Sequence, residues 1–139
     1  MVKNKSVEIN EQFQRALDLM EKTNRQVFIT GKAGTGKSTL LDYFRKNTKK
    51  KVAVLAPTGV AALNVQGQTI HSFCGFKPNI SLENVKKIAR KDSPRATLYR
   101  NLDTLVIDEI SMVRADLLDC VEKFLRLNGP RSSRPFGGI

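Results

Sequence analysis

The chain has 139 residues, which is enough for one domain with a hydrophobic core. Its net charge of +11 suits a polyanionic partner, although a solvated lysine-rich surface without a partner explains charge alone equally well. No apolar run approaches the length of a membrane span, and the N-terminus lacks the apolar stretch of a signal peptide. We therefore expect a cytoplasmic protein, or a nuclear one if the source is eukaryotic.

The first predicted element is an amphipathic helix over residues 10–21, because apolar residues recur there at intervals of three and four. Its inward face consists of Phe13, Ala16, Leu17 and Met20. The short apolar run Val27–Thr30 follows and predicts a buried parallel strand. A helix is expected to begin near Thr39.

Between that strand and that helix, residues 31–38 read Gly-Lys-Ala-Gly-Thr-Gly-Lys-Ser, which fits G-x-x-x-x-G-K-[ST]. Glycines allow a tight turn whose N–H groups cradle phosphate oxygens, and the helix N-terminus adds positive charge. Lys37 would reach the β- and γ-phosphates, and the Ser38 hydroxyl would hold Mg²⁺. The pattern favours nucleoside triphosphate binding over a glycine-rich turn that binds nothing. The expected contacts are Gly31, Ala33, Gly34, Thr35, Gly36, Lys37, Ser38 and Thr39.

The middle of the chain predicts a second strand and several short helices. Pro57-Thr58-Gly59 ends the strand sharply. Residues 69–73 fit either a short strand or a helical turn. The expected elements are a strand over Val52–Ala56, a short helix over 60–63, a helix capped by Ser81 with Leu82, Val85, Ile88 and Ala89 on one face, and a short helix starting at Ser93-Pro94.

A third strand, Leu102–Ile107, precedes the last long helix, predicted over residues 114–127. That helix turns Val113, Leu117, Val121, Phe124 and Leu125 inward, and Asn128-Gly129-Pro130 ends it. Residues 131–139 are expected to form an irregular basic tail. Alternating strands and helices predict an α/β protein with three layers around a parallel sheet.

Cys74 and Cys120 lie far apart and form no C-x-x-C pair, so we expect two reduced thiols packed as small hydrophobic groups. The single His71 cannot support a multi-histidine metal site.

Asp108 and Glu109 follow the third strand directly, which would bring both carboxylates to the carboxyl edge of the sheet. Asp108 would hold Mg²⁺ through its water shell, and Glu109 would orient and deprotonate an attacking water. Acidic residues also occur at ordinary helix starts, but together with the phosphate loop the pair favours hydrolysis over phosphate binding alone. A small-molecule kinase is a further, weaker alternative.

Five blocks of sequence resemble the superfamily-one DNA helicases of the Pif-one type, close to the RecD-like group. The blocks are Gly31–Ser38, Ala56–Ala62, His71–Phe73, Asp108–Met112 and Arg134–Ile139. The resemblance covers nearly the whole chain. It implies the first RecA-like domain of a P-loop NTPase, with ATP and Mg²⁺ as cofactors and single-stranded DNA as partner, moving five-prime to three-prime. Lys37, Asp108 and Glu109 would be its catalytic residues.

By the same resemblance, Gln12 would recognise adenine, unless it is an ordinary surface residue of its helix. Pro57, Thr58 and Gly59 would contact the DNA backbone. The last group, His71, Ser72 and Phe73, would line the same track, with Phe73 offering a stacking face. The alternative for this group is a packed loop with Phe73 in the core.

The resemblance also predicts that the chain is a fragment. Residues 1–130 would form part of the first RecA-like domain, and residues 131–139 would lead into the family's third motif, whose strand normally lies between the phosphate-loop strand and the Asp108 strand. The second RecA-like domain and its arginine finger would lie elsewhere in the protein. We therefore expect weak ATP binding and slow or no hydrolysis from residues 1–139, or a non-catalytic module that binds nucleotide and DNA. The preferred DNA structure, the pathway and the oligomeric state are not indicated.

Overall fold

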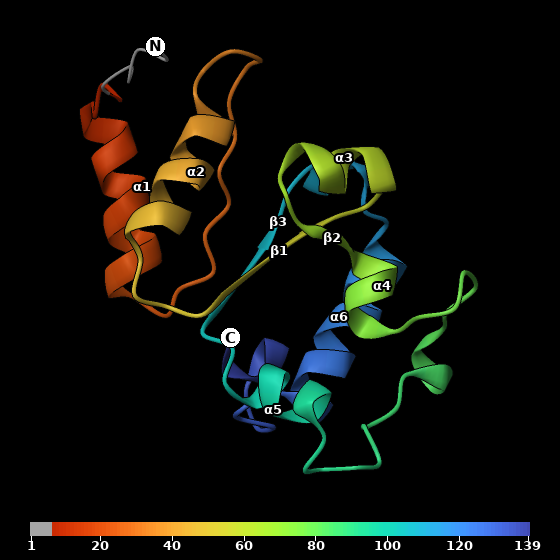
Figure 1. Ribbon diagram of the computed structural model, residues 1–139. Helices are drawn as coiled ribbons and strands as arrows, with labels where there is room; N and C mark the ends of the chain where they lie inside the picture. The colour runs from red at the N-terminus through yellow and green to blue at the C-terminus, as the bar shows by residue number, and fades with distance from the viewer. Residues whose placement is uncertain (1–6) are drawn as a thin grey trace. The chain divides into compact units, whose positions relative to one another are not determined.

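The computed structural model describes residues 7–139. These residues form two compact units, 7–49 and 50–139 (Figure 1). The first unit contains helices α1 (Glu11–Lys22) and α2 (Lys37–Asn47). The second contains strands β1 (Val52–Ala56), β2 (Gln68–Thr69) and β3 (Thr104–Ile107), helices α3 (Gly59–Asn64), α4 (Ile70–Cys74), α5 (Pro94–Arg100) and α6 (Ala115–Asn128), and the 3-10 turns η1 (Leu82–Asn84), η2 (Ile110–Met112) and η3 (Pro135–Gly138).

Helix α1 confirms the first predicted helix. The Asn10 side chain caps it by accepting a hydrogen bond from the Phe13 N–H at 2.8 Å, which satisfies one of the free donors of the first turn. The Phe13 ring lies edge-on to Tyr43 of α2, with 5.7 Å between centroids. This pair, together with the buried face of α2, forms the apolar contact between the two helices.

The predicted strand at Val27–Thr30 is wrong. These residues have no regular secondary structure, and the Phe28 side chain is 74% exposed. A strand exists only when a neighbouring strand pairs with its backbone groups, and the sheet holds β2, β1 and β3 without this segment. Apolar, β-branched residues are therefore not sufficient to form a strand here, because a strand also requires a partner strand.

The three strands form a parallel sheet in the order β2-β1-β3, which confirms the α/β class. β1 is central, with Leu55 opposite Gln68 on one side and Ile107 on the other. Gly67 lets the returning chain approach β1, because a Cβ at that position would lie 2.3 Å from the Val54 carbonyl oxygen. Residues 69–73 combine both of the predicted alternatives, since Thr69 ends β2 and α4 begins at Ile70.

The core of the second unit lies between β1 and helices α4, α5 and α6 (Figure 1). Leu55, Val121 and Leu125 are completely buried, and the Tyr99 ring lies edge-on to both Phe73 and Phe124. The Tyr99 hydroxyl donates to the Phe73 carbonyl oxygen, so the polar end of a buried tyrosine is satisfied. Helix α6 thus buries the face that its sequence predicted.

The helix expected after Ser81 is limited to the single turn η1, so most of that prediction is wrong. Asn128, the buried polar residue at the end of α6, bonds the following segment instead. Its amide oxygen accepts from the Ile88 N–H at 2.8 Å, and its amide nitrogen donates to the carbonyl oxygens of Lys86 at 3.3 Å and Phe124 at 2.9 Å. These bonds hold residues 86–88 in a non-helical conformation. By contrast, Ser93 caps α5 as expected.

The tail after α6 is more ordered than predicted. Residues Pro135–Gly138 form the turn η3, and the Arg131 N–H donates to the Gly137 carbonyl oxygen at 2.8 Å. Gly137 is buried in the left-handed region, and a Cβ there would lie 2.2 Å from the Leu125 carbonyl oxygen. Glycine is therefore required for the turn to pack against α6.

Both cysteines are buried free thiols, as expected. Burial raises the pKa of Cys74 from 9.0 to about 12, and it also raises the pKa of Cys120, with a further contribution from Asp116. None of the helices described over residues 7–139 is both long and apolar enough to span a membrane.

Replacing Asn128 with alanine should destabilise the chain. The change leaves the part-buried Ile88 N–H and Lys86 carbonyl without their partner, at a cost of about 1–3 kcal/mol. Asn101→Ala is the matched control, because Asn101 also donates to the carbonyl four residues earlier, at 2.9 Å, but is exposed. Urea unfolding should show less than about 1 kcal/mol for the control. Equal losses of stability in the two variants would show that the bonds from Asn128 to residues 86–88 add nothing to its bond within the helix.

Neither thiol should react with iodoacetamide in the folded chain at pH 9. Alkylation requires the thiolate, and a pKa of about 12 leaves roughly one Cys74 in a thousand ionised at that pH. The pKa is raised in the folded state, so unfolding in urea should restore an ordinary pKa and label both cysteines. Mass spectrometry of the two samples measures this, and rapid native labelling of Cys74 would contradict its burial.

Candidate nucleotide and nucleic-acid site

The phosphate loop of the first unit has the backbone conformation that its glycines predict. Gly34 and Gly36 have φ values of 79° and 94°, in the region that side chains disfavour. Gly36 is the N-cap of α2, so Lys37, Ser38 and Thr39 form its first turn, where backbone N–H groups have no partner within the helix. The loop therefore presents free donors and the positive end of a helix to an anion.

Lys37 lies against the loop that precedes it. Its ammonium donates to the carbonyl oxygens of Gly31 at 2.5 Å and Lys32 at 3.2 Å. The Thr35 hydroxyl also donates to the Lys32 carbonyl, at 2.6 Å, and a Cβ at Gly31 would lie 2.6 Å from that hydroxyl oxygen. These bonds make the loop compact and keep the cation beside it. Three of the predicted nucleotide contacts in this loop, Gly31, Ala33 and Thr35, are exposed.

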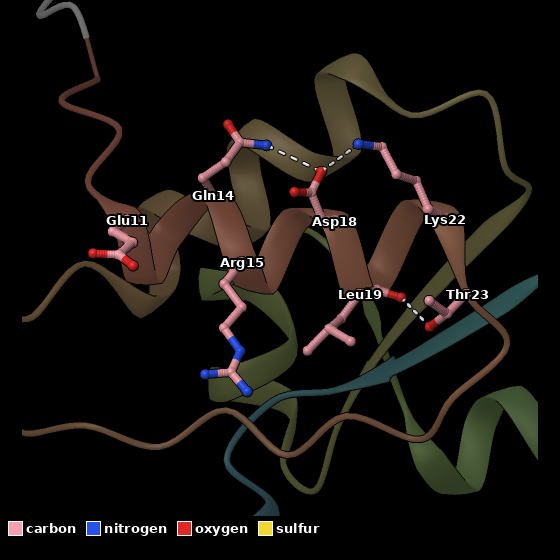
Figure 2. A pocket seen from close by; sticks show the side chains of 7 residues that line it. All are labelled: Glu11, Gln14, Arg15, Asp18, Leu19, Lys22 and Thr23. Carbon is pink, nitrogen blue, oxygen red and sulfur yellow. Dashed lines mark hydrogen bonds and ion pairs between the residues drawn. The ribbon is translucent and has the colours of Figure 1, made fainter.

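Gln12 is exposed in the first turn of α1, in the same unit as the phosphate loop. Another face of α1 carries a shallow hollow lined by Glu11, Gln14, Arg15, Asp18, Leu19, Lys22 and Thr23 (Figure 2). At its centre Asp18 accepts from Lys22 at 2.7 Å and from Gln14 at 3.1 Å, and the bond from Lys22 contributes most to lowering the pKa of Asp18. Its central carboxylate is thus already paired, and Gln12 does not line this hollow.

In the second unit, three of the other predicted blocks, Ala56–Ala62, His71–Phe73 and Asp108–Met112, meet at the carboxyl edge of the sheet, whereas Arg134–Ile139 packs against the end of α6. Parallel strands end at the same edge, so the residues that follow β1, β2 and β3 are neighbours there. Pro57 and Thr58 follow β1, His71 and Ser72 follow β2, and Asp108 follows β3. The Asp108 N–H donates to the Leu55 carbonyl oxygen at 2.8 Å, which ties the acidic pair to the central strand. The structure thus brings Asp108 to the same edge as Thr58, which lies fifty residues earlier in the sequence.

Threonine hydroxyls begin the helices at two of these strand ends. Thr58 accepts from the Ala61 N–H at 3.2 Å at the start of α3, and Thr69 accepts from the Ser72 N–H at 3.1 Å at the start of α4. Each hydroxyl acts as an acceptor in its cap, so its proton remains available to donate to a ligand oxygen. Gly59 is the first residue of α3 and is exposed. Thr69 was not singled out from the sequence, although a Thr preceding a helix is a typical cap signal.

The His71–Phe73 block divides between surface and core. Ser72 is exposed, and His71 is half-buried with its ring edge-on to Phe76 at 6.4 Å between centroids. Phe73 is 5% exposed and packs edge-on against Tyr99, with 5.1 Å between centroids. Its stacking face is covered by protein, so the alternative of a core residue fits Phe73, and the predicted base-stacking role does not.

Asp108 and Glu109 differ in exposure and conformation. Asp108 is half-buried, whereas Glu109 is exposed and has a φ of 53°, in the left-handed region that non-glycine residues rarely adopt. This conformation turns the chain from β3 into η2 directly after the acidic pair. An unusual backbone conformation at a carboxylate is typical of functional sites.

Nearly the whole chain is similar to proteins of one known family. Residues 6–139 match the model of the PIF1-like helicase family. A relative from Candida albicans, "ATP-dependent DNA helicase PIF1", is 44% identical over 118 residues, which cover 81% of this chain and 13% of the relative. A solved Bacteroides Pif1 helicase in complex with ADP-AlF3 and single-stranded DNA is 37% identical, with a TM-score of 0.79 over 96% of this chain and 31% of that one.

A second solved structure, of two coordinating Pif1 helicases described as unwinding forked double-stranded DNA, is 38% identical with a TM-score of 0.79 and covers 95% of this chain and 32% of that one. The chain therefore spans less than a third of the length of the solved relatives it matches. The match to the family nonetheless extends over all the residues that the structure describes. The chain belongs to the PIF1-like helicase family.

Proposed function

We propose that this chain is the nucleotide-binding part of an ATP-dependent DNA helicase that moves along single-stranded DNA. The observation that carries the proposal is the convergence of the Thr58, His71 and Asp108 segments at one edge of the sheet, in a chain that also has a complete phosphate loop. Relatives named as ATP-dependent DNA helicases, and a relative solved with ADP-AlF3 and single-stranded DNA, support it.

The phosphate loop fits a nucleotide because it combines two left-handed glycines, the unpaired N–H groups that begin α2 and the cation of Lys37. Lys37 would exchange its bonds to the Gly31 and Lys32 carbonyls for bonds to the β- and γ-phosphates. The free N–H groups at the start of α2 would hold further phosphate oxygens, and Gln12 would recognise the base. Gln12, Lys37 and the first residues of α2 are all exposed, so a ligand can reach them.

Ser38 and Asp108 each carry oxygen atoms of the kind that Mg²⁺ prefers, and each is proposed as a ligand in addition to phosphates and water. Bound Mg²⁺ would neutralise charge on the phosphate oxygens during hydrolysis. Glu109 is exposed and could accept a proton from an attacking water. These roles make Lys37, Asp108 and Glu109 the proposed catalytic residues.

Single-stranded DNA would contact the edge formed by the residues after β1 and β2. Thr58 offers its hydroxyl proton to phosphate oxygens, and Thr58 and Gly59 offer backbone N–H groups. Pro57, His71 and Ser72 would extend the same surface. Phe73 is left out of this surface because its ring is buried. The track is thus proposed to bind the backbone of the strand rather than to stack on its bases.

Lys37→Ala should weaken binding of a fluorescent ATP analogue with Mg²⁺ by about tenfold to a hundredfold, because charged hydrogen bonds contribute about 1.5–3 kcal/mol. Lys32→Ala is the matched control, since it removes the same charge from the same loop while its carbonyl remains. A titration followed by anisotropy measures both. If both variants bind as the parent chain does, the loop is not a nucleotide site. In the protein that carries this chain, Lys37→Ala should also abolish unwinding, and loss of binding without any effect on unwinding would favour a non-catalytic module.

Thr58→Ala should weaken binding of a single-stranded oligonucleotide by roughly tenfold, because the phosphate loses a hydroxyl donor. Ser93→Ala is the matched control, since it removes an equivalent helix cap from α5, which does not begin at this sheet edge, and should cost a similar stability of about 1 kcal/mol. Anisotropy gives the affinities and urea unfolding gives the stabilities. Equal loss of affinity in the two variants would mean that capping, and not contact with DNA, explains the effect.

A further inference from the structure

A basic segment that the proposed site does not use lies at the other end of the second unit. Residues 86–91 read Lys-Lys-Ile-Ala-Arg-Lys, with four cations and no acid. Lys86, Lys87, Arg90 and Lys91 are all exposed. Arg90 pairs with Asp92 at 3.1 Å, but over residues 7–139 the three lysines form no ion pair. Lys86, Lys87 and Lys91 therefore present positive charge that no acidic side chain pairs with among the described residues.

Asn128 of α6 fixes the backbone of this segment, and Lys123 of α6 holds the turn η1 that precedes it. Lys123 donates to the Leu82 carbonyl oxygen at 2.6 Å, and Asn128 bonds the backbone of Lys86 and Ile88. A buried amide that bonds both a donor and an acceptor of an otherwise irregular segment holds its backbone in one conformation. The lysines thus extend from a fixed backbone, which reduces the ordering cost of binding a ligand.

The segment is distant from the edge assigned to single-stranded DNA. Helix α6 begins after β3 ends at that edge and runs away from it, and residues 86–88 contact its last residue (Figure 1). Fourteen helical residues span about 21 Å. A strand bound across the sheet edge would therefore leave this segment free for another ligand.

We propose that the segment 86–91 binds the backbone of duplex DNA, as a contact additional to the single-strand track. This proposal rests on the proposed function. The segment contains no aromatic residue, whereas surfaces that bind single strands combine positive charge with stacking side chains. Duplex DNA carries about one negative charge per 1.7 Å of its axis and is bound through its phosphates without base stacking. Charge without aromatic groups thus matches a duplex better than a single strand.

The test compares Lys86→Gln/Lys87→Gln with the parent chain, using a fluorescent blunt-ended duplex and a fluorescent thymidine single strand over a range of salt concentrations. Lys46→Gln/Lys49→Gln is the matched control, because it removes two exposed charges from the first unit. The first variant should bind duplex roughly five- to twentyfold more weakly, and its log–log salt slope should fall by about 1 to 2. Single-strand affinity should change by less than about twofold. Urea unfolding confirms that both variants are folded.

Several outcomes would overturn the proposal. Unchanged duplex affinity and slope, or equal losses in the control variant, would mean that the segment makes no specific contact. An equal loss on the single strand would place the segment in the single-strand track. Displacement of duplex from the parent chain by polyglutamate at matched charge would indicate an acidic protein partner. If the parent chain binds neither the ATP analogue nor the single strand, the proposed function itself fails, and that result is independent of the duplex measurement.

Discussion

The parallel pairing of β1 with a strand on each side is the interaction on which the second unit depends. β1 is the one strand that bonds both β2 and β3, and Leu55 and Ala56 at its end are completely buried. Parallel strands end at a common edge, so this pairing determines where Thr58, His71 and Asp108 lie. Without β1 in the centre, these segments would share no edge, because nothing else in their local sequence brings them together.

Side chains that bond backbone groups then define the conformations around that edge. Thr58 and Thr69 begin the helices after two strands, and the Tyr99 hydroxyl bonds the carbonyl of Phe73. In the first unit, the ammonium of Lys37 has the same kind of partner, since it bonds two carbonyls of its own loop. The groups proposed to bind nucleotide and DNA are therefore engaged with the protein backbone, and ligand phosphates would have to compete with, or add to, these bonds.

Much of this arrangement could be predicted from the sequence, because local signals and tertiary structure agree. β1, α1, α5 and α6 lie where periodicity, capping residues and proline placed them, and the phosphate loop has its glycines in the left-handed region. The failures arise where a distant partner decides the structure. Residues 27–30 have the composition of a strand but form none. The helix expected after Ser81 gives way to a bond from Ile88 to Asn128, which lies forty residues further along the chain. A distant partner also determines the environment of Phe73, because its ring packs against Tyr99 and is buried there.

Gly67 shows how tolerance to substitution can be low at a residue that contacts no ligand. Its missing side chain allows the chain to pass close to the Val54 carbonyl and to pair as β2, which is only two residues long. Even a methyl group would push the strand away from β1, and so short a strand has few other bonds with which to keep its register. Thr69, His71 and Ser72 would move with it. A substitution at Gly67 would thus produce the same defect as one in the DNA track, and in a genetic screen it would be mistaken for a contact residue.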